Sequence, residues 1–157
     1  MREPTKNKND PKPRAANPNR DKGHRFERAD VNMLKKKYPD AVTSRLESKA
    51  ADARKVDIVG VPYLWQCKYG YPKGIDYHTL HLDIKRLNSK SSLPVFIHHK
   101  FGRKKLQDLA VVSVKDLLTI IDNCNKENSG KVTEKTTSID LSTFLVIVPF
   151  NEIKDYV

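Results

Sequence analysis

An acid, an amide and an amine follow one another closely in the middle of the chain, as Asp57, Gln66 and Lys68. In a strand through residues 64–68, alternation places Gln66 and Lys68 on the same face. If the hairpin turns on Val61-Pro62, Asp57 pairs directly with Gln66, and their Cβ atoms lie about 5 Å apart on a shared face. We therefore expect one patch of sheet to carry all three groups.

A second acid, Glu27, heads the apolar stripe of a predicted helix, with Val31, Leu34 and Tyr38 following at i+4, i+7 and i+11. A glutamate that faces the core needs a cation or hydrogen-bond donors to offset its desolvation. We expect this helix to bring Glu27 to the same patch of sheet.

These residue types suit metal-assisted hydrolysis of a phosphodiester. Mg²⁺, with Mn²⁺ as a substitute, prefers oxygen ligands and keeps several waters. The predicted metal ligands are Glu27 (directly or through water), Asp57, the Gln66 amide oxygen and the Cys67 carbonyl. The metal activates water and neutralises charge on the phosphate, while Lys68 orients the water or stabilises the phosphate. The predicted catalytic residues are Glu27, Asp57, Gln66 and Lys68.

A purely structural interpretation of the same residues stays open. Asp57 and Lys68 can form a salt bridge across an exposed hairpin, worth under about 1 kcal/mol. Glu27 can simply complement the positive end of its own helix.

The elements that position these residues predict a single α/β domain, with a mixed β-sheet flanked by helices. The predicted helices cover residues 23–38, 76–88 and 113–124, the last opened by a capping box of Ser113 and Asp116. The predicted strands cover residues 41–46, 56–59, 63–69, 93–99, 109–114 and 144–148. Residues 125–138 are predicted to form a polar loop.

The net charge of the chain indicates the class of partner that it binds. The 157 residues carry 30 Lys+Arg against 19 Asp+Glu, a formal charge of +11. Nucleic acid is the leading partner, an anionic membrane surface is the next, and a basic protein without a polyanion partner is the third interpretation. No apolar run suggests a membrane span or a secretory signal, and two cysteines fit a reducing, cytoplasmic compartment.

Residues 1–22 are predicted to form a disordered basic tail, with four prolines and seven basic residues against three acidic ones. The tail either follows DNA or only aids solubility. A basic turn with Arg103, Lys104 and Lys105 is predicted to hold DNA through its phosphates. Adjacent His98 and His99 point to opposite faces of a strand and therefore do not share one ion. Trp65 and the tyrosines near 69–77 either pack in the protein or stack on unpaired bases.

Glu27, Val56-Asp57-Ile58 and Gln66-Cys67-Lys68 together resemble the PD-(D/E)xK nuclease superfamily in its E…D…QxK form. The surrounding residues are similar to the archaeal-type and phage Holliday junction resolvases over about residues 23–115. They include Gly23 to Arg28, Ser44-Arg45, Ser48 and the run from Leu93 to Ile97.

The resemblance implies a restriction-endonuclease-like fold over residues 23–157, a divalent metal, and a homodimer that cuts branched DNA. It also implies that Ser44 and Arg45 lie near the site and touch phosphate. Gln66 stands where resolvases usually carry Glu, which removes one negative charge from the metal site, while the QxK form is similar to Mrr-type restriction endonucleases.

The sequence thus predicts a metal-dependent, structure-selective DNA endonuclease, foremost a Holliday junction resolvase. Such an enzyme would act in the cytoplasm, at the nucleoid, of a bacterial, archaeal or phage-infected cell. The alternatives are a restriction- or repair-type endonuclease that acts on duplex DNA, and a catalytically inactive DNA-binding module of the same fold.

Overall fold

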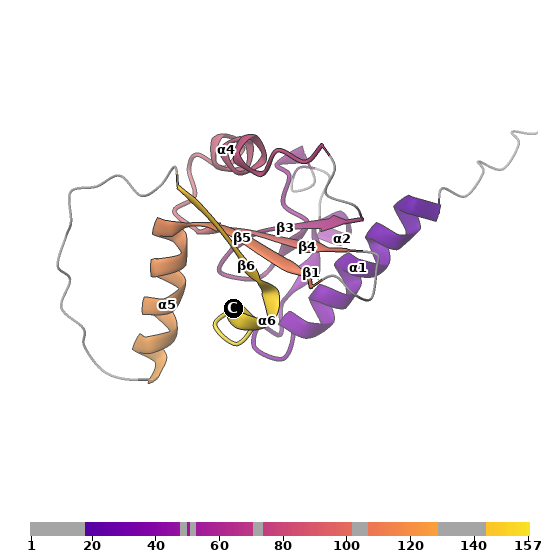
Figure 1. The fold of residues 1–157 in the computed structure, drawn as a ribbon. Helices are drawn as coiled ribbons and strands as arrows, with labels where there is room; N and C mark the ends of the chain where they lie inside the picture. The colour runs from indigo at the N-terminus through magenta and orange to yellow at the C-terminus, as the bar shows by residue number, and fades with distance from the viewer. Residues whose placement is uncertain (1–17, 48–49, 51–52, 71–73, 102–106, 129–143) are drawn as a thin grey trace, which may run out of the picture.

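A six-stranded mixed sheet forms the centre of the molecule in the computed structural model (Figure 1). The structure describes residues 18–47, 50, 53–70, 74–101, 107–128 and 144–157. The strands lie in chain order: β1 (Val42–Thr43), β2 (Ile58–Val59), β3 (Leu64–Tyr69), β4 (Val95–Lys100), β5 (Leu109–Ser113) and β6 (Leu145–Pro149). Neighbouring strands are antiparallel except β3 and β4, which are parallel. The chain between them passes through α4 (Tyr77–Leu87).

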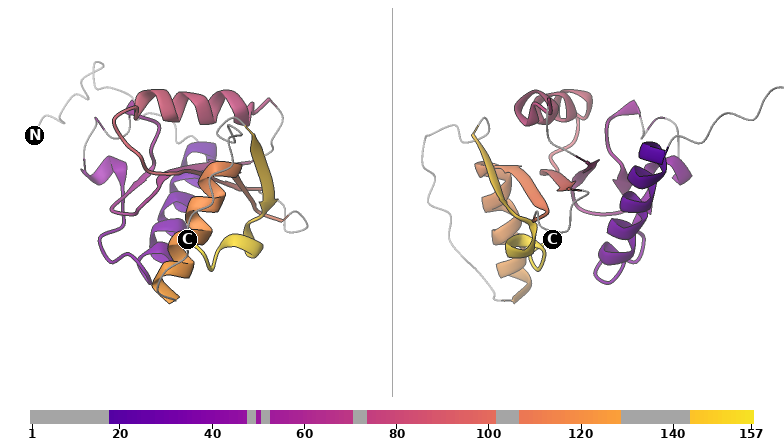
Figure 2. Two further views of the ribbon diagram at one scale, coloured as in Figure 1. Left: turned by 90° about the vertical axis from the view of Figure 1, so that its left-hand side faces the viewer. Right: turned by 45° about the vertical axis from the view of Figure 1, so that its right-hand side comes forward.

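Helices cover both faces of this sheet. Helix α4 lies on one face, and α1 (Pro18–Leu34), α5 (Val114–Asn128) and the short α6 (Phe150–Ile153) lie on the other (Figures 1 and 2). The four-residue α2 (Ser44–Glu47) follows β1 directly. The predicted α/β class, a single domain with a mixed sheet flanked by helices, is therefore confirmed.

The two faces carry separate apolar cores, as strand alternation requires. The core under α1 includes Phe26, Leu34, Trp65, Cys67, Phe96, Ala110, Val112, Ile120 and Phe150. The core under α4 includes Val56, Leu64, Ile84, Val95, Ile97 and Val111. Gln66 and Lys68 alternate with Trp65 and Cys67, so they belong to the face that α4 covers.

The predicted hairpin is present with the predicted register. Ile58 pairs with Trp65, which places Asp57 against Gln66. Gly60 makes the turn at a φ of +77°, and a Cβ there would collide with the backbone carbonyl of Asp40. Only glycine fits this position without strain.

Several predicted boundaries are wrong. Helix α1 begins at Pro18, so residues 18–22 are helical and not part of a tail. Proline suits the first turn of a helix, where its missing N–H has no partner to lose. Within 41–46 only residues 42–43 form a strand, because the chain turns into α2 at Ser44.

At the other end of the chain, α5 continues through Asn128 into the predicted loop, and α6 was not predicted. Residues 1–17, 129–138 and the predicted DNA-binding residues Arg103, Lys104 and Lys105 lie outside the described residues. In the described ranges no helix is both long and apolar enough to cross a bilayer.

Candidate active site

Asp57 lies where β2 and β3 separate. Its backbone N–H donates to the Trp65 carbonyl over 2.8 Å. The next donor along β3, the N–H of Cys67, donates instead to Asp57 Oδ2 over 2.8 Å. The carboxylate therefore takes the place of a backbone acceptor at the point where the sheet opens.

Gln66 connects the two oxygens that the sequence assigned to a metal. Its Nε2 donates to Asp57 Oδ2 and, over 3.1 Å, to the Cys67 carbonyl. One amide group thus reaches both oxygens, so they converge closely enough to serve a single ligand. The predicted neighbourhood of Asp57, Gln66 and the Cys67 carbonyl is present, but the amide nitrogen of Gln66 faces these two oxygens, not the amide oxygen that was predicted to bind a metal.

Glu27 approaches from α1 and is 8% exposed. Its Oε1 lies 3.4 Å from Nη2 of Arg45, and Nη1 of the same guanidinium group contacts Nε2 of His24. Arg45 extends from α2, and it is exposed enough to meet solvent and a ligand as well. The predicted Arg45 therefore lies beside a predicted site acid.

Ser44 has a different position from the one expected of a phosphate contact. It is 1% exposed, and its hydroxyl has no hydrogen-bond partner among the described residues. Its backbone N–H donates to the Asp57 carbonyl over 2.8 Å, so Ser44 supports the backbone of Asp57.

The electrostatics of the site single out Asp57. Burial, together with the negative charge of Glu27, raises the pKa of the Asp57 carboxyl to about 6. The Cys67 N–H and the positive charges of Lys68 and Arg45 act in the opposite direction. An acid with a raised pKa, flanked by charges of both signs, is typical of functional sites.

Lys68 is half-buried on β3, and its ammonium group forms no hydrogen bond or ion pair with the residues that the structure describes. Its charge nevertheless acts on Asp57, so the two lie near each other without direct contact. The ammonium group is therefore available to a ligand. The predicted Asp57–Lys68 salt bridge, the structural alternative, is absent from the described ion pairs.

The neighbour of Lys68 in the parallel register is His99, which is fully buried. Its Nε2 donates to the Gly70 carbonyl over 2.8 Å, and Tyr77 Oη contacts Nδ1. Burial, with the nearby charges of His98 and Lys68, lowers the pKa of His99, so the ring is neutral beside Lys68. His98 points to the opposite face, as the alternation along the strand predicted.

A buried acid that the prediction missed, Asp30, fixes α1 to the sheet. Its Oδ2 accepts hydrogen bonds from Trp65 Nε1 (3.0 Å), Cys67 Sγ (3.3 Å) and His98 Nδ1 (2.8 Å). Asp30 follows Glu27 by three residues on the same helix face, so the argument applied to Glu27 would have found it. By anchoring α1, Asp30 fixes the position of Glu27.

The donor set is oxygen-rich and suits a hard cation. Two carboxylates and a backbone carbonyl match the ligands that Mg²⁺ prefers, and the Gln66 amide joins them when its oxygen turns toward the cation in place of Nε2. In the described part of the chain, His, Cys, Asp and Glu side chains form no group of three that could hold a metal ion. The metal site would therefore depend on the amide and the carbonyl. Cys67 is no nucleophile, because burial and the nearby Asp30 raise the pKa of its thiol.

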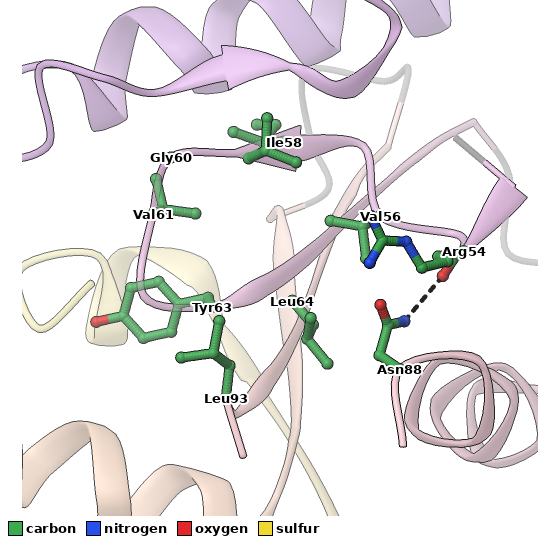
Figure 3. Close-up of a pocket in the computed structure, with 10 residues that line it drawn as sticks. Arg54, Val56, Ile58, Gly60, Val61, Tyr63, Leu64, Asn88 and Leu93 are labelled. Atoms are coloured by element: carbon green, nitrogen blue, oxygen red, sulfur yellow. Dashed lines mark hydrogen bonds between the residues drawn. The ribbon is translucent and has the colours of Figure 1, made fainter. Parts of the chain in front are cut away.

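A hollow of about 150 Å³ lies behind the hairpin (Figure 3). Its walls include Val56, Ile58 and Leu64, and Asn88 donates to the Arg54 carbonyl at one end. No carboxylate lines it, so it is not a candidate for the metal chemistry.

Comparisons of the chain with protein-family models, curated proteins and solved structures find no significant match.

Proposed function

We propose that this chain is a metal-dependent, structure-selective DNA endonuclease of restriction-endonuclease-like fold, which resolves four-way junctions as a homodimer in the cytoplasm. One observation carries the proposal: the Gln66 amide reaches both Asp57 Oδ2 and the Cys67 carbonyl, while Glu27 and Lys68 act electrostatically on the same carboxylate. The mixed sheet with helices on both faces is consistent with such a fold.

Asp57, Gln66 and the Cys67 carbonyl would hold Mg²⁺ or Mn²⁺, with Glu27 directly or through a water. When bound, the metal activates water and neutralises charge that builds on the phosphate. Asp57 is ionised above its pKa of about 6, so neutral pH prepares it for a cation.

The remaining residues orient the reactants. Lys68 makes no competing bond within the described residues, and its ammonium is free to orient the attacking water or stabilise the phosphate. Arg45, which already holds Glu27, has the exposure to contact a phosphate of the strand. The formal charge of +11 supports DNA as the partner.

A catalytically inactive DNA-binding module is the second candidate, and a specific observation favours it. Both acids are satisfied within the protein, Asp57 by Gln66 and Cys67, and Glu27 by Arg45. A neutral glutamine also brings less negative charge to a cation than a glutamate would.

The decisive experiment compares cleavage of a synthetic four-way junction with cleavage of the matching linear duplex, with and without Mg²⁺. We expect Mg²⁺-dependent cuts in the junction. We expect Asp57→Asn to reduce the rate on the order of 10³-fold or more while junction binding stays intact. Asp122→Asn, an exposed acid on α5, is the matched control.

Equal cleavage of both DNAs would replace the resolvase by a duplex endonuclease. Cleavage retained in Asp57→Asn would contradict the site. If calorimetry detects neither Mg²⁺ nor Mn²⁺ binding and no cut appears, the inactive module is correct.

A further inference from the structure

Helix α1 has a second side, turned away from Glu27, that carries two cations. Lys22, Arg25, Phe26 and Ala29 follow the spacing i, i+3, i+4 and i+7, so they share one side of the helix. Successive residues of an α-helix are about 100° apart around its axis, so Glu27, the residue after Phe26, points in a different direction. The two flanks therefore meet different parts of the sheet.

A hollow of about 220 Å³ lies along the Lys22 flank. We call it the α1 hollow, and its lining residues are Lys22, Arg25, Phe26, Ala29, Tyr69 and Lys100. Three of the six are cations and none is an acid. The two aromatic rings are neighbours, with centroids 6.1 Å apart.

The side chains differ in their availability to a ligand. Phe26 is 4% exposed and forms the floor, while Tyr69 is half-buried at the wall. Lys100 Nζ lies 5.7 Å from the Phe26 ring centroid and 3.5 Å from Asp108 Oδ2. Lys22 and Arg25 are exposed at the rim. The α1 hollow thus offers an aromatic wall with positive charge around its mouth.

This combination selects a phosphate attached to a flat ring. Cations that follow the backbone, together with aromatic rings on which bases stack, are the features by which proteins bind single-stranded nucleic acid. The volume is below the roughly 300–1,000 Å³ of ordinary small-molecule pockets, which suits one nucleotide unit of a longer strand.

We infer that the α1 hollow holds one unpaired nucleotide of the DNA strand, with its phosphate at Lys22, Arg25 and Lys100 and its base against Tyr69. This inference rests on the proposed action on DNA and names a part of the substrate.

The α1 hollow gives a physical basis for structure selectivity. A base in a continuous duplex must lose its pairing and stacking, at a few kcal/mol, before it can reach Tyr69. A base at a fork or branch point is already free. The hollow therefore favours branched DNA over linear duplex without any contact to base edges.

The test measures binding by fluorescence anisotropy without divalent metal, so that no cut is needed. The probes are a linear duplex and the same duplex with a forked, unpaired end, at constant salt. We expect the protein to bind the fork at least about tenfold more tightly than the duplex. We expect Tyr69→Ala to remove this preference and Tyr69→Phe to retain it.

The matched charge variants are Lys22→Ala/Arg25→Ala at the hollow and Lys35→Ala/Lys36→Ala beyond the end of α1, and all four side chains are exposed. We expect the first pair to weaken fork binding about tenfold and duplex binding much less. We expect the second pair to weaken both DNAs equally. Because the charge variants replace exposed residues, they test the inference even if Tyr69→Ala does not fold.

If Tyr69→Ala keeps the preference, or if both charge pairs weaken fork and duplex alike, the inference is wrong. A fork preference that depends on the hollow, in a protein that cuts nothing with Mg²⁺, supports the inference and removes the endonuclease. Mg²⁺-dependent cutting without a fork preference supports the endonuclease and contradicts the inference about the α1 hollow. If the protein binds no DNA, both proposals are wrong.

Discussion

Two aspartates contact the same residue of β3, the buried Asp30 and the half-buried Asp57, and they have opposite roles. Asp57 accepts the backbone N–H of Cys67, and Asp30 accepts the thiol of the same residue. Asp30 extends from α1 into the aromatic core, whereas Asp57 lies at the edge where the sheet opens. One residue of β3 therefore holds both acids at fixed positions.

The difference lies in what else each carboxylate meets. Asp30 Oδ2 accepts three side-chain donors, including the indole of Trp65 and the ring of His98. Asp57 has an amide, a backbone N–H and the negative charge of Glu27 nearby, and its pKa is raised to about 6. Asp30 stabilises the fold, while ionised Asp57 is a destabilising group of the kind that functional sites retain.

The largest expected effect separates the two acids by stability. Asp30→Ala leaves three buried donors without their acceptor, so we expect the free energy of unfolding to fall by about 3–5 kcal/mol. Urea unfolding monitored by Trp65 fluorescence measures it. Asp122→Ala on the exposed side of α5 should change the value by less than about 0.5 kcal/mol. A loss below about 1 kcal/mol for Asp30→Ala would mean that the cluster does not anchor α1.

The second prediction concerns the pH dependence of stability, and here replacing the aspartate is expected to stabilise the protein. The folded protein holds the Asp57 proton up to about pH 6, and the unfolded chain releases it near the ordinary aspartate pKa of 3.8. Stability contributed by this group is therefore lost as pH rises through that interval. We expect Asp57→Asn to stabilise the metal-free protein by about 1–3 kcal/mol at pH 8 and to have little effect below about pH 4.

Urea unfolding of both proteins in a chelator, at intervals from about pH 4 to about pH 8, checks this prediction. The difference between variant and parent isolates Asp57 from other titrating groups. Parallel stability curves across the whole range would show that the Asp57 carboxyl titrates normally.

The third and smallest effect tests the amide between the oxygens. Gln66→Glu places a second carboxylate against Asp57, so we expect the metal-free protein to lose about 1–2 kcal/mol at pH 8. Mg²⁺ should restore that loss, because the added charge strengthens cation binding. Gln66→Ala is the matched variant that should gain nothing from Mg²⁺. An equal response of both variants to Mg²⁺ would place the metal elsewhere.

The sequence was sufficient for the parts of the site that depend on local patterns. The alternation along β3 and the glycine turn at Gly60 specify the register that brings Asp57 to Gln66. Helical spacing likewise predicted that Glu27 faces inward, and it is buried. These features depend on periodicity and on one tight turn, both of which are visible in a short window.

Features that depend on contacts between distant parts of the chain could not be predicted from the sequence. The partner of Asp30 on β4, His98, is fixed by the parallel pairing of Cys67 with His98 across the α4 crossover. No local pattern sets that register. The same applies to α6, where four residues after Pro149 carry Phe150 onto the ring of His98 at a centroid distance of 3.7 Å. The predicted catalytic and DNA-binding roles stay predictions.

The Asp30 cluster also bears on how the chain reaches its native state. Its three donors lie 35, 37 and 68 positions further along the sequence than the acceptor. During synthesis on a ribosome, α1 therefore emerges with an acid on its apolar side long before β4 exists to receive it. Docking of the helix must wait for the middle of the polypeptide, so premature collapse around α1 is disfavoured and the position of Glu27 is set only after β4 has formed.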